Sequence, residues 1–131
     1  NIINDKIEFF CNNNPKKYHV VKNLGQVKYL SSMNCVDLLI GNSSSGIIES
    51  ASFSKPAVNI GERQKGRIKN ENVIDCKIKD LSKSIELALS SGFTIKCQNQ
   101  QNIYGTGNAS ISIVNELISQ PLSVVKKFVD I

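Results

Sequence analysis

Apolar side chains recur at helical spacing in four segments of the chain. The first segment is residues 2–12, and the polar run from Asn12 to Pro15 interrupts its pattern. A second helix is predicted from Gly25 to Met33, where apolar residues lie three positions apart. The two remaining predicted helices are 81–89, with Asp80 as N-terminal cap and Gly92 as C-terminal cap, and about 109–119, which Pro121 follows closely.

Short apolar runs between these helices predict strands. A strand is predicted at 36–40, where Leu38, Leu39 and Ile40 form a continuous apolar run, as expected of a parallel strand that is covered on both faces. Further strands are predicted at 19–21, 55–61 and 72–76. Strands that alternate with helices indicate an α/β fold with a parallel sheet and right-handed crossovers. The length of 131 residues allows one domain with a modest core.

A polar turn follows the strand at 36–40 and holds the three serines at 43–45 and then Gly46. A helix that begins here would direct its first N–H groups and the positive end of its dipole at a bound anion. Glu49 would lie on the same helix face as Ser45, where its carboxylate could accept hydrogen bonds from a ribose diol. These features predict a nucleotide site. The alternative reading is an ordinary serine cap with an acidic residue in the first turn, which needs no ligand.

A cationic loop follows the next predicted strand, at residues 62–67. In a doubly wound sheet this loop lies at the same carboxyl edge as the serine turn, which is where such folds bind ligands. We therefore expect Arg63 to reach the same ligand as the serines.

Composition argues against several other classes of function. The formal charge is +5, but the lysines are scattered and aromatic residues make up only 6% of the chain, so we expect no nucleic-acid partner. His19 is the only histidine, and we read it as structural or exposed. No metal site is expected, because the four cysteines lie far apart without a paired motif: Cys11, Cys35, Cys76 and Cys97.

The same cysteines are expected to be free thiols in a cytoplasmic protein. No apolar run approaches the roughly 20 residues that cross a bilayer, and no signal peptide is recognisable, so we expect no membrane partner.

Three motifs together resemble the hydrolysing UDP-N-acetylglucosamine 2-epimerases of sialic-acid and related nonulosonic-acid biosynthesis. The motifs are the serine turn with its glutamate at 41–49, the segment from Pro56 to Val73 with Arg-Gln-Lys-Gly-Arg at 63–67, and residues 103–109. The loop at 63–67 is similar to the hydrolysing branch rather than to the non-hydrolysing one. One departure is Thr106, where the family usually has Asp.

The resemblance implies that residues 1–131 are a single Rossmann-like, C-terminal nucleotide-binding domain, truncated from a longer enzyme with two such domains in the glycosyltransferase-B arrangement. It implies a UDP-sugar substrate, no cofactor, a missing N-terminal domain as partner, and a homo-oligomer when the protein is full length. By the same resemblance, Ser43, Ser44 and Gly46 form the turn that binds the diphosphate, and Arg63 binds the phosphate region. Glu49 binds the ribose hydroxyls, and the backbone near Leu24 binds the uracil.

No residue of this chain is a candidate general acid or base, because the resemblance assigns proton transfer to the missing segment. The whole enzyme would form N-acetylmannosamine and UDP, and the fragment alone would be inactive. Two alternatives remain at this point: the donor-nucleotide domain of a glycosyltransferase of the same architecture, and a free-standing nucleotide-binding module.

Overall fold

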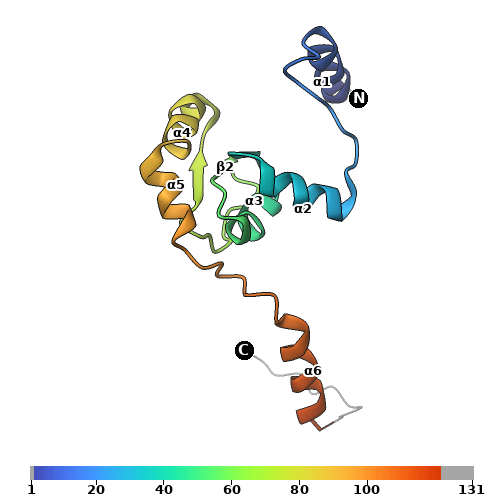
Figure 1. The fold of residues 1–131 in the computed structure, drawn as a ribbon, viewed down its shortest axis with the longest axis vertical. Helices are drawn as coiled ribbons and strands as arrows, with labels where there is room; N and C mark the ends of the chain where they lie inside the picture. The colour runs from blue at the N-terminus through green and yellow to red at the C-terminus, as the bar shows by residue number, and fades with distance from the viewer. Residues whose placement is uncertain (1, 122–131) are drawn as a thin grey trace. The chain divides into compact units, whose positions relative to one another are not determined.

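The computed structural model describes residues 2–121 and divides the chain into two compact units, Asn1–Val36 and Asp37–Ile131 (Figure 1). Each unit is described by itself.

The first unit contains two helices, α1 (Ile2–Asn13) and α2 (Gly25–Cys35), which confirms both predicted helices. The chain leaves α1 through a turn in which the rings of Phe10 and Tyr18 pack 4.7 Å apart between centroids. The strand predicted at 19–21 is wrong, because this segment has no regular structure. Its β-branched residues favour an extended chain, but a strand also needs a hydrogen-bonded neighbour, and none of the described strands pairs with it.

The second unit contains a parallel sheet of three described strands in the order β1-β2-β3. The strands are β1 (Leu39–Gly41), β2 (Ala57–Ile60) and β3 (Val73–Cys76), so the three other predicted strands are confirmed. β2 and β3 are shorter than predicted, and β1 begins three residues later and ends one residue later than predicted. Gly41 lies opposite Asn59, which in turn lies opposite Asp75. These three residues therefore mark the carboxyl edge of the sheet.

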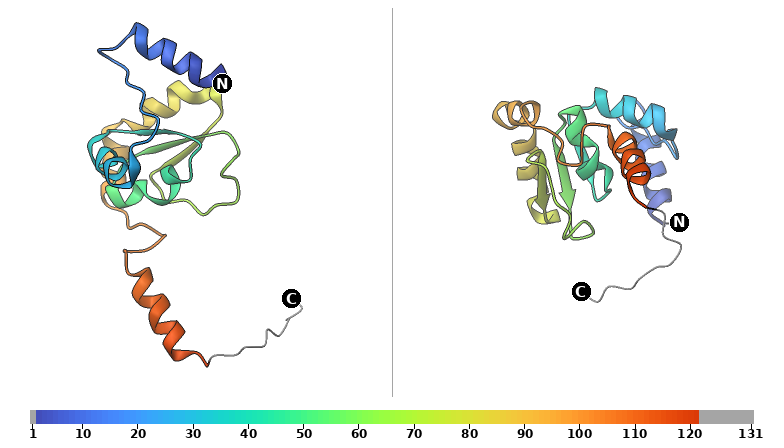
Figure 2. Two further views of the ribbon diagram at one scale, coloured as in Figure 1. Left: turned by 90° about the vertical axis from the view of Figure 1, so that its right-hand side faces the viewer. Right: turned by 90° about the horizontal axis from the view of Figure 1, so that it is seen from below.

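Helical segments flank this sheet: α3 (Ser45–Ile48), the 3₁₀ turns η1 (Ser50–Phe53) and η2 (Ile78–Asp80), α4 (Leu81–Ala88) and α5 (Ser91–Gln98). The helix α6 (Ala109–Ser119) follows further along the chain. The predicted helices at 81–89 and 109–119 are confirmed as α4 and α6. In Figure 2, right, α4 and α5 (yellow and orange) lie on one side of the strands and α3 (green) on the other. The unit is thus an α/β fold of the Rossmann-like type.

The predicted N-cap position of α4 is confirmed, and the predicted C-terminal cap is wrong. Asp80 occupies the N-cap position, but its side chain makes no capping hydrogen bond. Gly92 does not end α4, because a new helix, α5, begins at Ser91. The Ser90 hydroxyl accepts a hydrogen bond from the Phe93 N–H at 3.4 Å, and this bond caps α5.

The core lies between α4 and one face of the sheet. Val58, Cys76 and Ala88 are buried there, and four partly buried residues pack around them: Leu38, Ile60, Ile74 and Leu81. The opposite face carries Ala57, against which Gly46 of α3 packs so closely that a Cβ on Gly46 would lie 3.7 Å from the Ala57 Cβ. The two faces of β2 thereby fix α4 on one side and the serine turn on the other.

Candidate anion-binding site

The serine turn begins where β1 ends. The Ser43 hydroxyl accepts a hydrogen bond from the Ser45 N–H at 3.3 Å. Ser44 occupies the N-cap position of α3, and its carbonyl accepts from the N–H groups of Ile47 and Ile48 at 3.0 and 2.9 Å. Ser43 is exposed and Ser44 is half-buried, so both hydroxyls lie at or near the surface at the carboxyl edge of the sheet.

The helix that follows is shorter than predicted. α3 has 4 residues, and the chain then tightens into η1, which ends at Ser54 in the left-handed conformation with φ 54°. A single turn sums few peptide dipoles, so an anion here would depend on individual N–H and hydroxyl donors more than on a macrodipole. Glu49 is half-buried at the C-cap of α3, and its N–H donates to the Ser45 carbonyl at 3.0 Å. This bond places Glu49 one helical turn beyond Ser45, as its spacing predicts.

The loop after β2 bends back to the serine turn. Arg63 Nη1 donates to the Asn42 carbonyl at 3.2 Å, and Gln64 Nε2 donates to the same oxygen at 2.8 Å. Arg63 is exposed, whereas Gln64 is only 4% exposed. Gly61 and Gly66 supply the turns of this loop, with φ 75° and 83°, values that residues with a Cβ rarely adopt.

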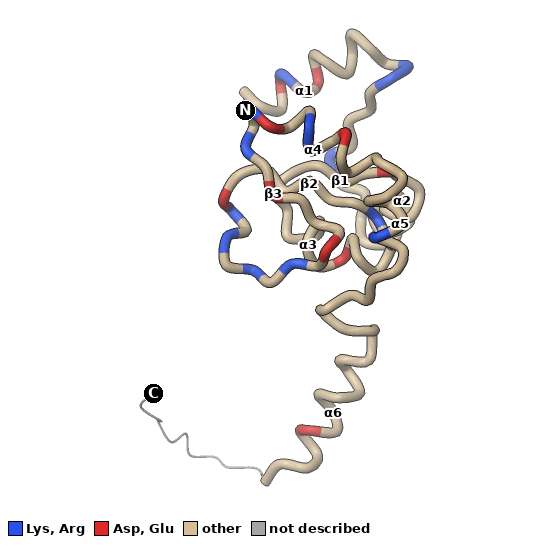
Figure 3. The backbone as a smooth tube through the Cα atoms, turned by 90° about the vertical axis from the view of Figure 1, so that its left-hand side faces the viewer, with Lys and Arg blue, Asp and Glu red and all other residues tan. Residues whose placement is uncertain are grey.

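The structure thus brings Arg63 next to the serine turn, although 21 residues separate it from Asn42. Sequence reasoning missed Gln64. Its place in a charged surface loop gives no sign that the side chain is buried. Figure 3 shows the basic residues of this loop in blue between β2 and β3.

The other end of the loop is tied to β3. Lys69 Nζ lies 2.7 Å from an Asp75 carboxylate oxygen, and the second oxygen accepts from Asn59 Nδ2 at 2.6 Å. Burial raises the pKa of Asp75, but the hydrogen bonds from Lys69 and Asn59 and the charge of Lys69 outweigh burial and hold this pKa below its ordinary value of 3.8. Asp75 is therefore ionised at neutral pH.

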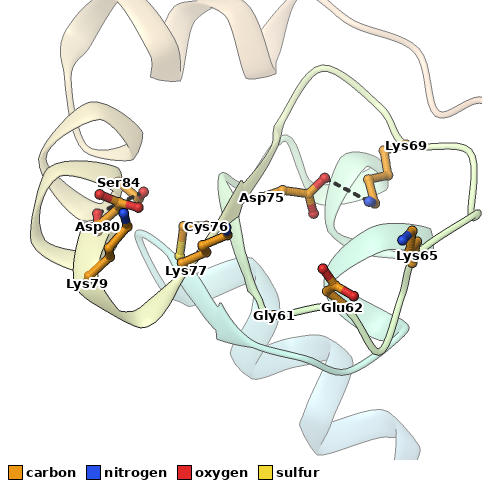
Figure 4. Close-up of a pocket in the computed structure, with 10 residues that line it drawn as sticks. All are labelled: Gly61, Glu62, Lys65, Lys69, Asp75, Cys76, Lys77, Lys79, Asp80 and Ser84. Atoms are coloured by element: carbon orange, nitrogen blue, oxygen red, sulfur yellow. Dashed lines mark hydrogen bonds and ion pairs between the residues drawn. The ribbon is translucent and has the colours of Figure 1, made fainter.

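A pocket of about 650 Å³ adjoins this ion pair (Figure 4). It is lined by residues of the loop, of β3 and of the segment that leads into α4: Gly61, Glu62, Lys65, Lys69, Asp75, Cys76, Lys77, Lys79, Asp80 and Ser84. None of the site residues predicted from the sequence lines it. The pocket and the serine turn are therefore separate features of the same sheet edge.

A network of side-chain amides holds the motif at 103–109. Asn102 Nδ2 donates to the Ile48 carbonyl at 2.7 Å, and Asn102 Oδ1 accepts from Asn70 Nδ2 at 3.1 Å. Asn70 Oδ1 accepts from the Ile103 N–H at 2.8 Å, and the Tyr104 hydroxyl donates to the Ile68 carbonyl at 2.6 Å. The motif therefore fastens the chain to the end of α3 and to the loop after β2. Within the motif, the Thr106 hydroxyl accepts from Asn108 Nδ2 at 3.3 Å.

Leu24 is the predicted site residue that the second unit does not contain. It is half-buried in the first unit, at the N-cap position of α2. Five of the predicted residues thus belong to one unit, namely Ser43, Ser44, Gly46, Glu49 and Arg63, and Leu24 belongs to the other.

Within residues 2–121, no group of three or more His, Cys, Asp or Glu side chains lies close enough to hold a metal ion. No helix in that part of the chain combines the length and apolar character needed to span a membrane.

Comparison with known proteins identifies relatives of this chain. A hydrolysing GDP/UDP-N,N'-diacetylbacillosamine 2-epimerase of Campylobacter jejuni is 46% identical over 92 residues, which are 70% of this chain and 24% of that protein. A hydrolysing UDP-N,N'-diacetylbacillosamine 2-epimerase of Legionella pneumophila is 34% identical over 103 residues, 79% of this chain and 27% of that protein. The polysialic acid biosynthesis protein P7 of Escherichia coli is 33% identical over 135 aligned residues, 99% of this chain and 34% of that protein.

The chain therefore spans between 24% and 34% of the length of these curated relatives. The sequence profile of one family, UDP-N-acetylglucosamine 2-epimerase, matches residues 1–118 and so includes the serine turn, the loop at 61–69 and the motif at 103–109. The chain belongs to the UDP-N-acetylglucosamine 2-epimerase family.

Proposed function

We propose that this chain is the UDP-binding, C-terminal domain of a hydrolysing nucleotide-sugar 2-epimerase that acts in the cytoplasm. Ser43, Ser44 and the backbone at Gly46 hold the diphosphate, and Arg63 neutralises part of its charge. Glu49 accepts hydrogen bonds from the ribose hydroxyls, and the backbone near Leu24 binds uracil. The groups that move protons belong to a preceding domain, and the whole protein is a homo-oligomer.

The observation that supports this proposal is the hydrogen bond from Arg63 Nη1 to the Asn42 carbonyl at 3.2 Å, which places the guanidinium beside the serine turn. A guanidinium has five N–H donors, and one bond to a carbonyl leaves the others for phosphate oxygens. Hydroxyls and main-chain N–H groups of the turn add further donors at the same place. A cation and several neutral donors around one exposed turn suit a diphosphate.

These groups would act on the leaving group of the reaction. A base on the preceding domain removes the proton at C2 of the sugar, the electron pair forms the C1–C2 double bond, and the C1–O bond breaks to release UDP. Water then adds across the double bond of the 2-acetamidoglucal and gives the free sugar with inverted C2. Negative charge grows on the diphosphate as the C1–O bond breaks, so donors on this domain stabilise the transition state more than the ground state.

We propose UDP-N-acetylglucosamine as the sugar nucleotide and N-acetylmannosamine as the product. A second candidate is the UDP-linked diacetamido sugar, because the Campylobacter and Legionella relatives are named for N,N'-diacetylbacillosamine. Assays of the full-length enzyme with each of the two UDP-sugars distinguish the candidates by the ratio of their kcat/KM values.

A nuclear magnetic resonance titration tests the UDP site on this chain. UDP should shift the amide resonances of residues 43–49, and uridine should shift them much less. Arg63→Ala should weaken UDP binding about tenfold, the effect of roughly 1.4 kcal/mol of lost charge-assisted hydrogen bonding. Arg67→Ala is the matched control, because Arg67 is an exposed arginine of the same loop. Equal shifts from UDP and uridine, or equal effects of the two substitutions, would contradict the phosphate assignment.

A further inference from the structure

We infer that Gln64 is a positioning residue that fixes the orientation of the Asn42–Ser43 peptide and so presents the Ser43 N–H to the diphosphate. The inference rests on the proposed function, and it adds a role for a buried side chain that touches no ligand.

Two side chains donate to the Asn42 carbonyl, but their surroundings differ. Gln64 is 4% exposed, and its Nε2 lies 2.8 Å from the oxygen. Arg63 is exposed and lies at 3.2 Å. A carbonyl oxygen has two lone pairs, so it can accept both bonds at once. The buried, shorter bond from Gln64 is shielded from water, whereas water can replace the exposed bond from Arg63 at small cost.

The orientation of this carbonyl also sets the orientation of the next N–H. The peptide unit is planar, and the described part of the chain has no cis peptide bond, so the Asn42 C=O and the Ser43 N–H point in opposite directions. While Gln64 holds the carbonyl toward the loop, the Ser43 N–H points away from the loop. If this peptide flipped, the carbonyl oxygen would take the place of the N–H and would repel a phosphate.

This geometry gives Arg63 and Gln64 different roles. When a diphosphate binds, Arg63 can turn from the carbonyl to a phosphate oxygen, because its guanidinium is exposed. Gln64 then remains as the buried donor to the Asn42 carbonyl. A glutamine suits this position because it donates without placing a net charge in a buried site. Glutamate has the same shape but, when ionised, can only accept hydrogen bonds, so it would repel the carbonyl.

The experiment compares Gln64→Met and Gln64→Glu with the unaltered chain. Methionine has similar length and no donor, and glutamate keeps the shape with the opposite hydrogen-bonding character. The matched control is Gln98→Met, at an exposed glutamine of α5. Three quantities are measured: dissociation constants for UDP and uridine, the Ser43 amide shift and hydrogen-exchange rate without ligand, and the midpoint of thermal unfolding.

We expect each Gln64 substitution to weaken UDP binding about tenfold and to leave uridine binding unchanged, because only the diphosphate meets the Ser43 N–H. The Ser43 amide shift and exchange rate should change even without ligand, and Gln98→Met should change none of these quantities. A merely structural role for Gln64 would lower the unfolding midpoint and weaken both ligands equally, which would overturn the inference.

Failure of the proposed function gives a different result. If the unaltered chain binds no UDP, the proposed function is wrong for this chain, and the ligand-free Ser43 amide decides the role of Gln64. A changed Ser43 amide in both Gln64 variants supports the positioning role. A folded Gln64→Met chain with an unchanged Ser43 amide overturns it, as does unchanged UDP affinity in a chain that does bind UDP.

Discussion

Two carboxylates of the second unit, Glu49 and Asp75, differ in their surroundings and hence in their expected roles. Glu49 is half-buried at the end of α3, one turn from the serines, and the structure shows no ion pair that would occupy its carboxylate within residues 2–121. Asp75 is held by Lys69 and Asn59 at the end of β3. The first is available to a ligand, and the second serves the fold.

Glu49→Gln should weaken UDP and uridine alike and leave pyrophosphate binding unchanged, because only the nucleosides carry a ribose. The loss of one charge-assisted acceptor, roughly 1.5–3 kcal/mol, corresponds to about 10- to 150-fold in affinity. Titration calorimetry with the three ligands measures this, and Glu86→Gln on the exposed face of α4 is the control. If UDP affinity stayed the same in a full-length enzyme while proton exchange at C2 vanished, Glu49 would instead be the base.

Asp75→Asn should lower the free energy of unfolding at neutral pH by only about 0.2–1 kcal/mol, because the carboxylate is 54% exposed and solvent screens its ion pair. The folded-state pKa of Asp75 lies below its ordinary value of 3.8, so the stabilisation is complete at pH values above 3.8 and is lost as the pH falls through the folded-state pKa.

Urea unfolding of both proteins at pH 7, 5 and 2.5 checks this dependence. The difference between them should be the same at the two higher pH values and should be smaller at the lowest. Asp37→Asn, at an exposed aspartate, is the control. A difference that grew on acidification would show that the carboxylate destabilises the fold.

At the scale of whole elements, Asn102, the residue before the motif at 103–109, connects segments that are distant in the sequence. Asn102 binds the Ile48 carbonyl and Asn70, which lie 54 and 32 residues away. Asn102 therefore ties the end of α3 to Asn70, which follows the loop that carries Arg63. Thr106 bonds only within the motif among the described contacts.

Asn102→Ala should destabilise the second unit by about 1–3 kcal/mol, because it leaves partly buried groups without their hydrogen bonds. The Ile103 N–H, which donates to Asn70, should exchange with solvent faster than in the unaltered chain. Asn115→Ala in α6 removes an exposed asparagine and serves as control. Unchanged exchange at Ile103 would show that Asn70 holds the motif without Asn102.

Elements with strong, uninterrupted patterns could be predicted from the sequence, and those that depend on tertiary partners could not. The strands near Ile40, Val58 and Ile74 were predictable because each contains a short run of apolar residues, as parallel strands usually do. The segment at 19–21 has the same local preference but no neighbouring strand. α5 was not predicted, because its sequence has no clear periodic apolar face. Cys97 is its only buried residue, and the Ser90 side chain caps its first turn.

In the candidate site, too, residues with a recognisable local pattern could be predicted, and a residue that depends on a tertiary contact could not. The serine turn, Glu49 and Arg63 could be predicted because each has a chemistry that its position in an α/β fold makes useful. Gln64 could not, because its importance comes from burial against a main-chain carbonyl, and neither its residue type nor its spacing predicts that contact.

For the molecule as a whole, we predict that this chain does not turn over substrate by itself. It spans between 24% and 34% of its curated relatives, and its described residues supply no positioned acid–base pair beside the serine turn. Half of an active site would leave the sugar in water without an oriented base, and orientation and desolvation account for much of an enzymatic rate.

Incubation of the purified chain with UDP-N-acetylglucosamine should release no N-acetylmannosamine above the blank, as measured by chromatography of the products. The full-length enzyme is the positive control. Release that depends on the chain and stops after a substitution within it would contradict this prediction.

The distribution of cysteines gives the chain an intrinsic chemical label site. All four are free thiols, but Cys11 and Cys35 of the first unit are half-buried and exposed, whereas Cys76 and Cys97 of the second are buried. Burial also raises the pKa of Cys97, which reduces its reactive thiolate form. A maleimide dye should therefore attach to the first unit only. With Cys11→Ser, a single dye on Cys35 would label the first unit at one defined position, without any introduced cysteine.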